Sequence, residues 1–343
     1  MKKTKFSSYC DNNICTGCRF CVKGQKLVLF ISGKCSRNCW YCSLSKKRKN
    51  VDLIWANERP IESSSDLIKE AQESRATSAG ITGGDPLLFL SRTIKFSKAL
   101  KNKFGKKFHI HIYLPTKLVN SSNIKKLSKY VDEFRLHPEF LINNSLADIE
   151  KIKLVSKIVG KRRLGIELPM IPDKKKEILE FILKVQSHIS FVNLNEFELS
   201  ETNIDSLKRY NLEEGGYVIT GSKPAGLWLL RELEKRKVKI SVHLCTAELK
   251  NLHQFKNRLK LHKTFPYGLR TKDGTVIYLA AYKKNNPHFD QLKKLKSVFY
   301  DKKKERIILS EKTARKLINN YKITRVEEFP TFDQIEVETE DIS

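Results

Sequence analysis

The sequence predicts an α/β protein built around a full or partial barrel of parallel strands covered by helices. Two observations lead to this fold class. Short apolar runs rich in β-branched residues recur through about the first 250 residues, and stretches with helical spacing of apolar residues separate them. Alternation of strands and helices is typical of parallel β/α units, which form either an open doubly wound sheet or a barrel.

The apolar runs predict eight strands in chain order, at 27–31, 79–82, 108–114, 133–136, 164–168, 189–194, 217–220 and 240–244. The clearest helices between them are expected at 65–75, which has Asp66 in its first turn, and at 223–237, which has a proline near its start. These elements belong to a predicted core domain of residues 26–250.

Two further segments flank this core. Residues 1–25 are polar and rich in cysteine, and we expect them to be a metal-binding segment. Residues 251–343 form a predicted α+β extension with an acidic tail from Asp333 that should be partly disordered. Its elements are expected at 248–261 (helix, beginning just before the boundary), 275–282 and 306–310 (strands), 312–321 (helix) and 323–329 (strand).

Composition limits the class of protein. Of the 343 residues, 40% are hydrophobic and 30% charged, which is enough apolar surface for a core and excludes wholesale disorder. No window approaches the roughly 18 apolar residues of a membrane span. The basic N-terminal stretch has no apolar segment behind it, so it does not look like a secretory signal. A cytoplasmic protein without a membrane partner is expected.

The chain is strongly basic, with 66 Lys and Arg against 38 Asp and Glu and a formal net charge of +28. Such an excess is common in proteins that bind nucleic acid. However, 49 of the 66 basic residues are lysines, whereas phosphate recognition more often uses the arginine fork. Contact with RNA and a solvated basic surface both remain open.

The cysteines are the most informative residues. Seven of the eight lie between Cys10 and Cys42, and a clustered set of reduced thiols indicates metal binding rather than disulfides. Cys35, Cys39 and Cys42 have the spacing C-x3-C-x2-C and begin four residues after the first predicted strand. Three thiolates can hold three corners of a [4Fe–4S] cluster and leave one iron open, as a catalytic site needs. The alternative is a zinc site completed by a remote histidine.

This cysteine loop, with the aromatic Tyr41 before the last cysteine, resembles that of the radical S-adenosylmethionine superfamily. A second landmark is ITGGDPLL, where Gly83, Gly84 and Asp85 resemble the family's Gly-Gly-Glu-type turn after its second strand. The resemblance covers about residues 26–245 and is strongest to archaeal proteins related to pyruvate formate-lyase-activating enzymes.

The resemblance implies an enzyme that cleaves S-adenosylmethionine reductively and generates a 5′-deoxyadenosyl radical. Cys35, Cys39 and Cys42 would then bind the [4Fe–4S] cluster, and a donor such as ferredoxin or flavodoxin would reduce it. S-adenosylmethionine would contact Tyr41 and the Gly83–Asp85 turn, with Asp85 accepting its amine. Further candidates near predicted strand ends for binding the rest of this cofactor are His111, Tyr113, Glu167, Asn193 and Asn195.

A second constellation, Cys10, Cys15, Cys18 and Cys21, supplies four thiolates within twelve residues. The nested spacing suits a second [4Fe–4S] cluster, whereas the C-x2-C-x2-G end resembles a zinc knuckle, so the metal remains open.

Weaker candidates for catalysis follow later strands: Cys245, His243 and His137. His109 and His111 alternate along one strand and should share a face. The basic run at 46–49 follows the cysteine loop, where it could meet a phosphate or an acidic electron donor.

The substrate is not evident from the sequence. Activation of a protein by a glycyl radical and modification of tRNA are the two favoured versions. The alternatives from other classes are a non-catalytic iron–sulfur electron carrier and a zinc-dependent nucleic-acid-binding protein, and neither explains both the open cysteine site and the Gly-Gly-Asp turn.

Overall fold

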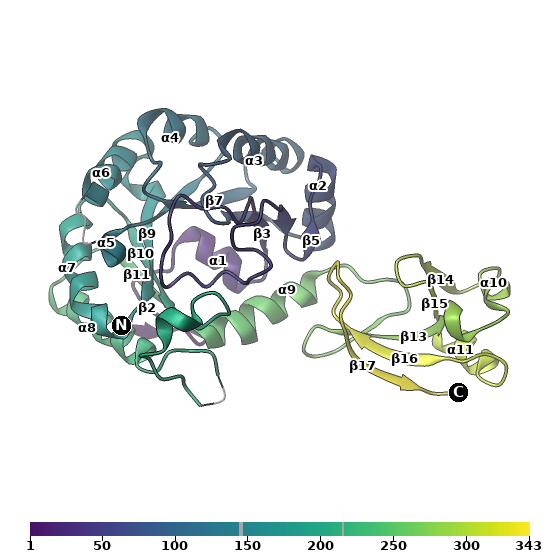
Figure 1. Ribbon diagram of the computed structural model, residues 1–343. Coiled ribbons are helices and arrows are strands. Elements are labelled where there is room, and N and C mark those ends of the chain that lie inside the picture. Colours follow the sequence, from purple (N-terminus) through teal and green to yellow (C-terminus); the bar gives the residue numbers. More distant parts are fainter. Residues whose placement is uncertain (144–146, 215) are drawn as a thin grey trace. The chain divides into compact units, whose positions relative to one another are not determined.

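A computed structural model describes residues 1–143, 147–214 and 216–343 (Figure 1). The chain divides into two compact units. The first comprises Met1–Gln72 and Ala76–Phe255, and the second comprises Glu73–Arg75 and Lys256–Ser343. The cysteine-rich N-terminal segment lies within the first unit.

The first unit contains a sheet whose central strands are all parallel. In spatial order these strands are β3 (Lys26–Phe30), β6 (Ser78–Thr82), β7 (His109–Pro115), β8 (Glu133–His137), β9 (Leu164–Met170), β10 (Phe191–Glu196) and β11 (Ser241–Cys245). Short antiparallel strands extend the two edges: β2 (Tyr9–Asp11) and β1 (Lys2–Lys3) beside β11, and β4 (Trp55–Ala56) and β5 (Arg59–Pro60) beside β3. The sheet curls into a partial barrel, which confirms the predicted fold class (Figure 1).

Helices cover the outside of this barrel (Figure 1). They are α2 (Ser64–Glu73), α3 (Leu90–Phe104), α4 (Ser121–Leu127), α6 (Ala147–Val159), α7 (Lys175–Val185) and α8 (Ser222–Lys235). Shorter turns join them: α5 (Phe140–Asn143), the 3-10 turns η1 (Lys161–Arg163), η2 (Pro172–Lys174) and η3 (Ile204–Leu207), and the π-helix η4 (Leu249–Phe255). None of the helices in the described ranges is long and apolar enough to cross a bilayer.

The period of two along each strand separates an apolar outer face from a polar interior. On β7, Ile110 and Ile112 are completely buried in the apolar core, whereas His109 and His111 belong to the opposite face. The two histidines therefore share a face, as the alternation predicts. The polar residues inside the barrel are mostly buried too, so they need partners from neighbouring strands or from a segment that fills the interior.

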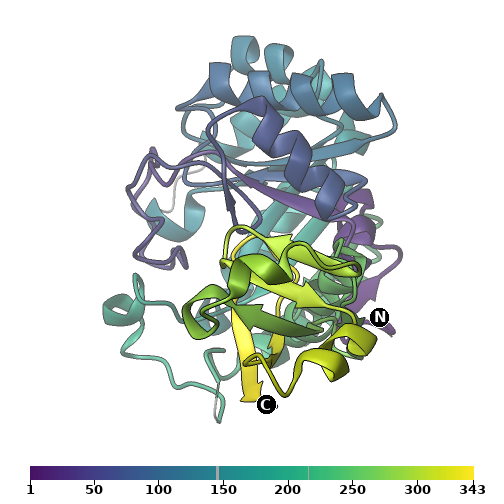
Figure 2. The same cartoon turned by 90° about the vertical axis from the view of Figure 1, so that its right-hand side faces the viewer.

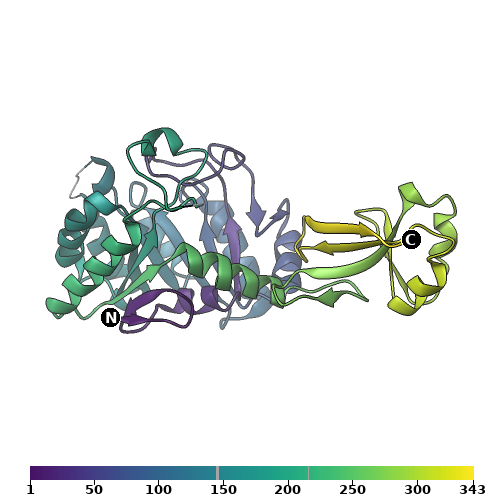
Figure 3. The same cartoon turned by 90° about the horizontal axis from the view of Figure 1, so that it is seen from below.

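The N-terminal segment provides that filling. Helix α1 (Thr16–Val22) lies inside the ring of strands, where it packs against β3, β6 and β7 (Figure 1). Seen from below, the segment lies at the end of the barrel where the parallel strands begin (Figure 3). Strand β2 anchors it, because Cys10 pairs with His243 on the edge strand β11.

One expected strand is wrong. Residues 217–220 form no strand of the sheet; they make only isolated bridges, Glu198 with Val218 and Leu212 with Ile219. Their backbone groups bond instead to the loop after β10, as in the 2.8 Å bond from the Ile219 amide to the Phe197 carbonyl. The apolar run therefore packs a loop onto the barrel rather than adding a strand.

The second unit is an antiparallel sheet with short helices, as expected for an α+β extension (Figure 2). Its strands are β12 (Leu269–Arg270), β13 (Val276–Tyr282), β14 (Val298–Asp301), β15 (Arg306–Leu309), β16 (Thr324–Glu328) and β17 (Glu336–Asp341), and its helical turns are α9 (Lys256–Leu261), η5 (Lys283–Asn285), α10 (Phe289–Leu292) and α11 (Glu311–Leu317). The helix expected at 248–261 is thus a π-helix followed by α9.

The acidic tail differs from the sequence expectation of partial disorder. Residues Glu336–Asp341 form the yellow strand β17, which pairs with β16 (Figure 2). Two basic side chains offset part of its charge: Arg325 lies 3.2 Å from Glu338, and Lys322 lies 2.8 Å from Asp341. The alternating acidic residues suggested a solvated tail, but here their backbone pairs with a neighbouring strand.

Candidate active site

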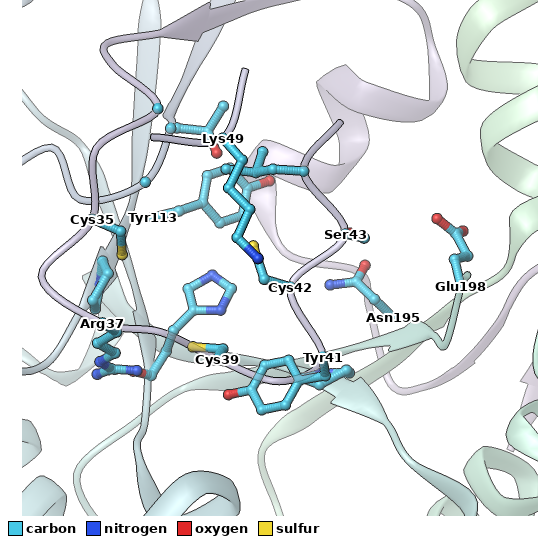
Figure 4. Close-up of a pocket in the computed structure, with 18 of the residues that line it drawn as sticks. Cys35, Arg37, Cys39, Tyr41, Cys42, Ser43, Lys49, Tyr113, Asn195 and Glu198 are labelled. Carbon is cyan, nitrogen blue, oxygen red and sulfur yellow. The ribbon is translucent and has the colours of Figure 1, made fainter. Parts of the chain in front are cut away.

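A pocket of about 350 Å³ opens where the parallel strands end. This size lies within the range of small-molecule sites. The sulfur atoms of Cys35, Cys39 and Cys42 lie around one part of this pocket (Figure 4). The side chains of Lys49 and Asn195 extend toward the same part (Figure 4). The sequence-predicted cysteine triad is therefore gathered in one cavity at the expected edge of the sheet.

The loop that carries these cysteines is fixed from several directions. Arg37 forms an ion pair with Glu139 at 2.6 Å and donates a hydrogen bond of 2.6 Å to the His137 carbonyl at the end of β8. On the other side, the Thr202 hydroxyl donates to the Cys42 carbonyl at 3.1 Å. A loop without regular structure is thus held in place over the strand ends by contacts to residues far away in sequence.

The thiols themselves are half-buried. Burial raises the pKa of Cys35 to about 11 and also raises the pKa of Cys39. Without metal the thiols of Cys35 and Cys39 are therefore protonated at neutral pH. Because a metal centre binds thiolates, its assembly here must release protons. This donor set, three cysteine sulfurs around an open cavity, fits three corners of an iron–sulfur cluster and leaves the rest of the pocket free.

The Gly83–Gly84 turn allows a close approach between two loops. A Cβ on Gly84 would lie 2.2 Å from the Lys34 carbonyl oxygen, and one on Gly83 would lie 2.5 Å from the Ser32 oxygen. Gly83 also has a φ of 145°, a conformation that favours glycine. Both glycines line the pocket. Two glycines are therefore required here for the turn to lie directly against the cysteine loop.

Asp85 is buried, and its carboxylate points into the protein. One oxygen accepts a 2.5 Å hydrogen bond from the Ser36 hydroxyl, and the other accepts a 2.9 Å bond from the Leu87 amide. The residue does not belong to the pocket lining among the described residues. In this structure Asp85 therefore joins the glycine turn to the cysteine loop through Ser36.

Of the other candidates for cofactor binding, Tyr41, Tyr113 and Asn195 line the pocket, and so does the weak catalytic candidate His137. Burial lowers the pKa of His137 to about 4, so its imidazole is neutral at pH 7. Burial also raises the pKa of Tyr41, whose hydroxyl bonds to Cys39. The pocket thus offers neutral hydrogen-bonding groups beside the thiols.

The remaining candidates lie deeper in the barrel, outside the described pocket lining: His111, Glu167, Asn193, His243 and Cys245. Glu167 accepts hydrogen bonds of 2.8 Å from the amides of Asn193 and Asn195 and one of 3.0 Å from Arg135. Asn193 also pairs with His243 at 2.7 Å. These side chains form a polar network below the pocket floor.

Arg135, which the sequence analysis did not select, is the centre of this network. Its guanidinium binds Glu133 at 2.7 Å and Glu167 at 3.0 Å, and it donates to the Tyr113 hydroxyl at 3.2 Å. The same side chain lies 3.1 Å from the sulfur of Cys15. Arg135 therefore links the pocket wall to the N-terminal cysteines.

Beside Arg135, the ligand atoms of His109, His111 and Glu133 lie within 4.8 Å of one another. Both ring nitrogens of His111 are buried without a hydrogen-bond partner in the described ranges. Burial holds the pKa of His111 well below its usual range, so this imidazole stays neutral beside the Arg135 charge.

Several charged pocket residues also escaped the sequence analysis. Glu196 and Glu198 follow the apolar part of β10, and Lys250 pairs with Glu198 at 2.6 Å. Their position at a strand end was a signal that could have revealed the two glutamates. Lys49 belongs to the basic run that was expected near the cysteine loop, and it lines the pocket.

Comparison with solved structures gives only distant likenesses. The anSMEcpe protein with bound AdoMet is 16% identical, with 63% of this chain and 60% of that chain covered and a TM-score of 0.37. The methyltransferase TsrM from Kitasatospora setae, with tryptophan and a SAM analog, is 9% identical, with coverage of 74% and 55% and a TM-score of 0.38. The chain spans about 60% of the length of the first of these proteins.

Sequence comparison is more decisive. The family model described as the Radical SAM superfamily matches residues 29–141, which include the cysteine loop and the Gly-Gly-Asp turn. A protein of Methanocaldococcus jannaschii, named provisionally as a glycyl-radical enzyme activating enzyme, is 38% identical over 274 residues, covering 76% of this chain and 72% of the relative. The chain therefore belongs to the radical S-adenosylmethionine superfamily.

Proposed function

We propose that the protein binds a [4Fe–4S] cluster through Cys35, Cys39 and Cys42 and uses it to cleave S-adenosylmethionine. The observation that carries this proposal is the gathering of the three thiols in one open pocket with the Gly83–Gly84 turn against their loop. When bound, the cluster supplies the electron that breaks the carbon–sulfur bond to the adenosyl group, which leaves methionine and a 5′-deoxyadenosyl radical able to take a hydrogen atom.

The residues of the chain bind and orient the reactants. The Gly83–Gly84 turn presents backbone close to the cysteine loop, and Asp85 keeps Ser36 of that loop in place. Whether the Asp85 carboxylate also reaches the cofactor amine remains a prediction. Tyr41, Tyr113 and Asn195 line the same cavity and are the groups that we assign to the cofactor. Glu167 supports Asn195 from below with a 2.8 Å hydrogen bond.

For the substrate, we propose a protein in which the enzyme generates a glycyl radical. The name of the Methanocaldococcus jannaschii relative supports this version. Modification of RNA is the second candidate, and the observation in its favour is the net charge of +28. The basic run at 46–49, beside the pocket, suits an acidic electron donor such as ferredoxin or flavodoxin.

The direct test is formation of 5′-deoxyadenosine. We expect the anaerobically purified, iron-loaded protein to release 5′-deoxyadenosine from S-adenosylmethionine after addition of dithionite. Cys39→Ala should abolish this release, whereas Ser45→Ala, at an exposed position of the same loop outside the pocket lining, should retain it. Iron-loaded wild type that binds S-adenosylmethionine but yields no 5′-deoxyadenosine would contradict the proposal.

A further inference from the structure

The eighth cysteine lies in the barrel interior with three of the four N-terminal cysteines. We propose that Cys15, Cys18 and Cys21 of the α1 segment, together with Cys245 of β11, bind a second iron–sulfur cluster inside the barrel. Cys10 is not a ligand in this proposal. This ligand set differs from the sequence-predicted one, Cys10, Cys15, Cys18 and Cys21, in that Cys245 takes the place of Cys10. This second centre does not depend on cleavage of S-adenosylmethionine in the pocket.

The spacing of the first three cysteines suits a helix. Cys15 is the residue before α1, and Cys18 and Cys21 follow at intervals of three, which places neighbours on one side of the helix. The Arg135 guanidinium confirms the juxtaposition of the first two, because one of its nitrogens lies 3.1 Å from the Cys15 sulfur and 3.4 Å from the Cys18 sulfur. Both sulfurs therefore contact a single buried cation.

That cation would also act on a cluster bound by these cysteines, through the two sulfurs that it contacts. Hydrogen bonds to sulfur from a charged donor are a known means of adjusting the potential of an iron–sulfur cluster.

Cys245 approaches α1 from β11. It is 7% exposed and pairs with Asn195, two residues beyond the paired His243 and Asn193 and on the same face of the strand. It packs against Val22, the last residue of α1. Val22 directly follows Cys21 in the chain, so Cys245 lies beside the end of the helix that carries Cys18 and Cys21.

Cys10 has different surroundings. Its thiol donates to the Asn12 carbonyl at 3.5 Å, and the charges that act on it are those of Asp11, Lys2 and the N-terminus. No other cysteine is among its electrostatic neighbours in the described ranges. Strand β2 carries it away from α1, along the edge of β11. Because of this separation, the proposal replaces Cys10 with Cys245 as the fourth ligand.

The spacing of the α1 cysteines favours a cluster over zinc. Cys15, Cys18 and Cys21 have the nested pattern C-x2-C-x2-C, which suits an iron–sulfur cluster, whereas zinc sites usually separate their cysteine pairs by ten or more residues.

The test isolates this centre by removing the first cluster. In a Cys35→Ala, Cys39→Ala, Cys42→Ala triple variant, reconstituted without oxygen, we expect about four irons per chain and an EPR signal after reduction. Adding Cys245→Ala should lower the iron content or change the EPR signal, whereas adding Cys10→Ala should leave both unchanged. Circular dichroism and gel filtration check that each variant remains folded. The same two single changes in the otherwise unmodified chain provide a second comparison.

Three results would overturn the proposal. The first is binding of one zinc and no iron. The second is loss of the cluster in Cys10→Ala together with its retention in Cys245→Ala. The third is a triple variant without iron when the wild type holds about four irons. None of them bears on Cys35, Cys39 and Cys42, because release of 5′-deoxyadenosine by the wild type reports on the first cluster separately.

Discussion

Arg135 is buried inside the barrel, and its contacts come from its own strand, from a neighbouring strand and from the N-terminal segment. Glu133 precedes it on β8, Glu167 lies on β9, and Cys15 and Cys18 lie at the start of the chain. A buried guanidinium is tolerated only when its charge and its hydrogen-bond donors are satisfied. Arg135, Glu133 and Glu167 therefore form a buried network in which the arginine compensates two carboxylates.

Removing the guanidinium should be strongly destabilising. In Arg135→Met, Glu133 and Glu167 would remain buried without their counter-charge, and loss of one partner of a buried pair costs about 3–5 kcal/mol. Urea unfolding of the metal-free protein measures the change. Arg231→Met, on the exposed side of α8, should change the free energy of unfolding by less than about 0.5 kcal/mol. Equal stability of the two variants would show that the interior is hydrated and not a buried ion network.

Individual site residues could be predicted from the sequence where they belong to one short, contiguous motif. The C-x3-C-x2-C loop and the Gly83–Gly84 turn are short strings, so their residues could be named in advance, and the structure places them in one pocket. Glu133 and Arg135 were missed because they lie within a run, 133–136, that looks like an ordinary strand. Their partners are distant in sequence, and only the fold brings them together.

Helix α1 is the element that fills the barrel interior. It lies against β3, β6 and β7, and Gly17 is its point of closest approach. A Cβ on Gly17 would lie 2.6 Å from an Arg135 nitrogen, 2.7 Å from His111 and 2.8 Å from Glu133. The Gly17 amide also donates a 3.1 Å hydrogen bond to Glu133. The absence of a side chain is therefore a packing requirement at this position.

Gly17→Ala should displace α1 from the barrel interior. The added methyl group must move a buried network, and overpacking of this kind costs about 1–3 kcal/mol. Limited proteolysis should then cleave the N-terminal segment faster than in wild type, and thermal unfolding should begin at a lower temperature. Thr16→Ala, at the exposed neighbouring position, is the matched control. If Gly17→Ala protected the segment as well as Thr16→Ala does, the close packing of α1 would be refuted.

The strands of the barrel could be predicted because their sequence patterns have a local cause. A strand with one buried face alternates apolar and polar residues, and a strand with two buried faces is a continuous apolar run. Two elements show the limit of this reasoning. Residues 217–220 have the composition of a strand but pair with a loop, and the acidic β17 has the composition of a tail but pairs with β16. In both cases pairing with another segment decides the structure, and the composition of the run itself does not report that pairing.

The positive charge of the molecule is distributed almost evenly along the chain. Basic residues outnumber acidic ones by 20 in residues 1–255 and by 8 in residues 256–343. A positive field of this size attracts any polyanion, regardless of its sequence. Binding to RNA is thus expected from charge alone, and it becomes evidence for an RNA substrate only if it has properties that charge does not explain.

The expected behaviour of RNA follows from this argument. Because lysines dominate the basic residues, we expect binding of a single-stranded RNA to weaken by at least about tenfold between about 50 and 200 mM salt, with little dependence on base sequence. Filter binding measures the affinity. The yield of 5′-deoxyadenosine from the reduced, iron-loaded enzyme should not rise when that RNA is added. Binding that resists salt, selects one RNA and raises this yield would replace the protein substrate proposed above with an RNA substrate, since none of these properties can arise from net charge.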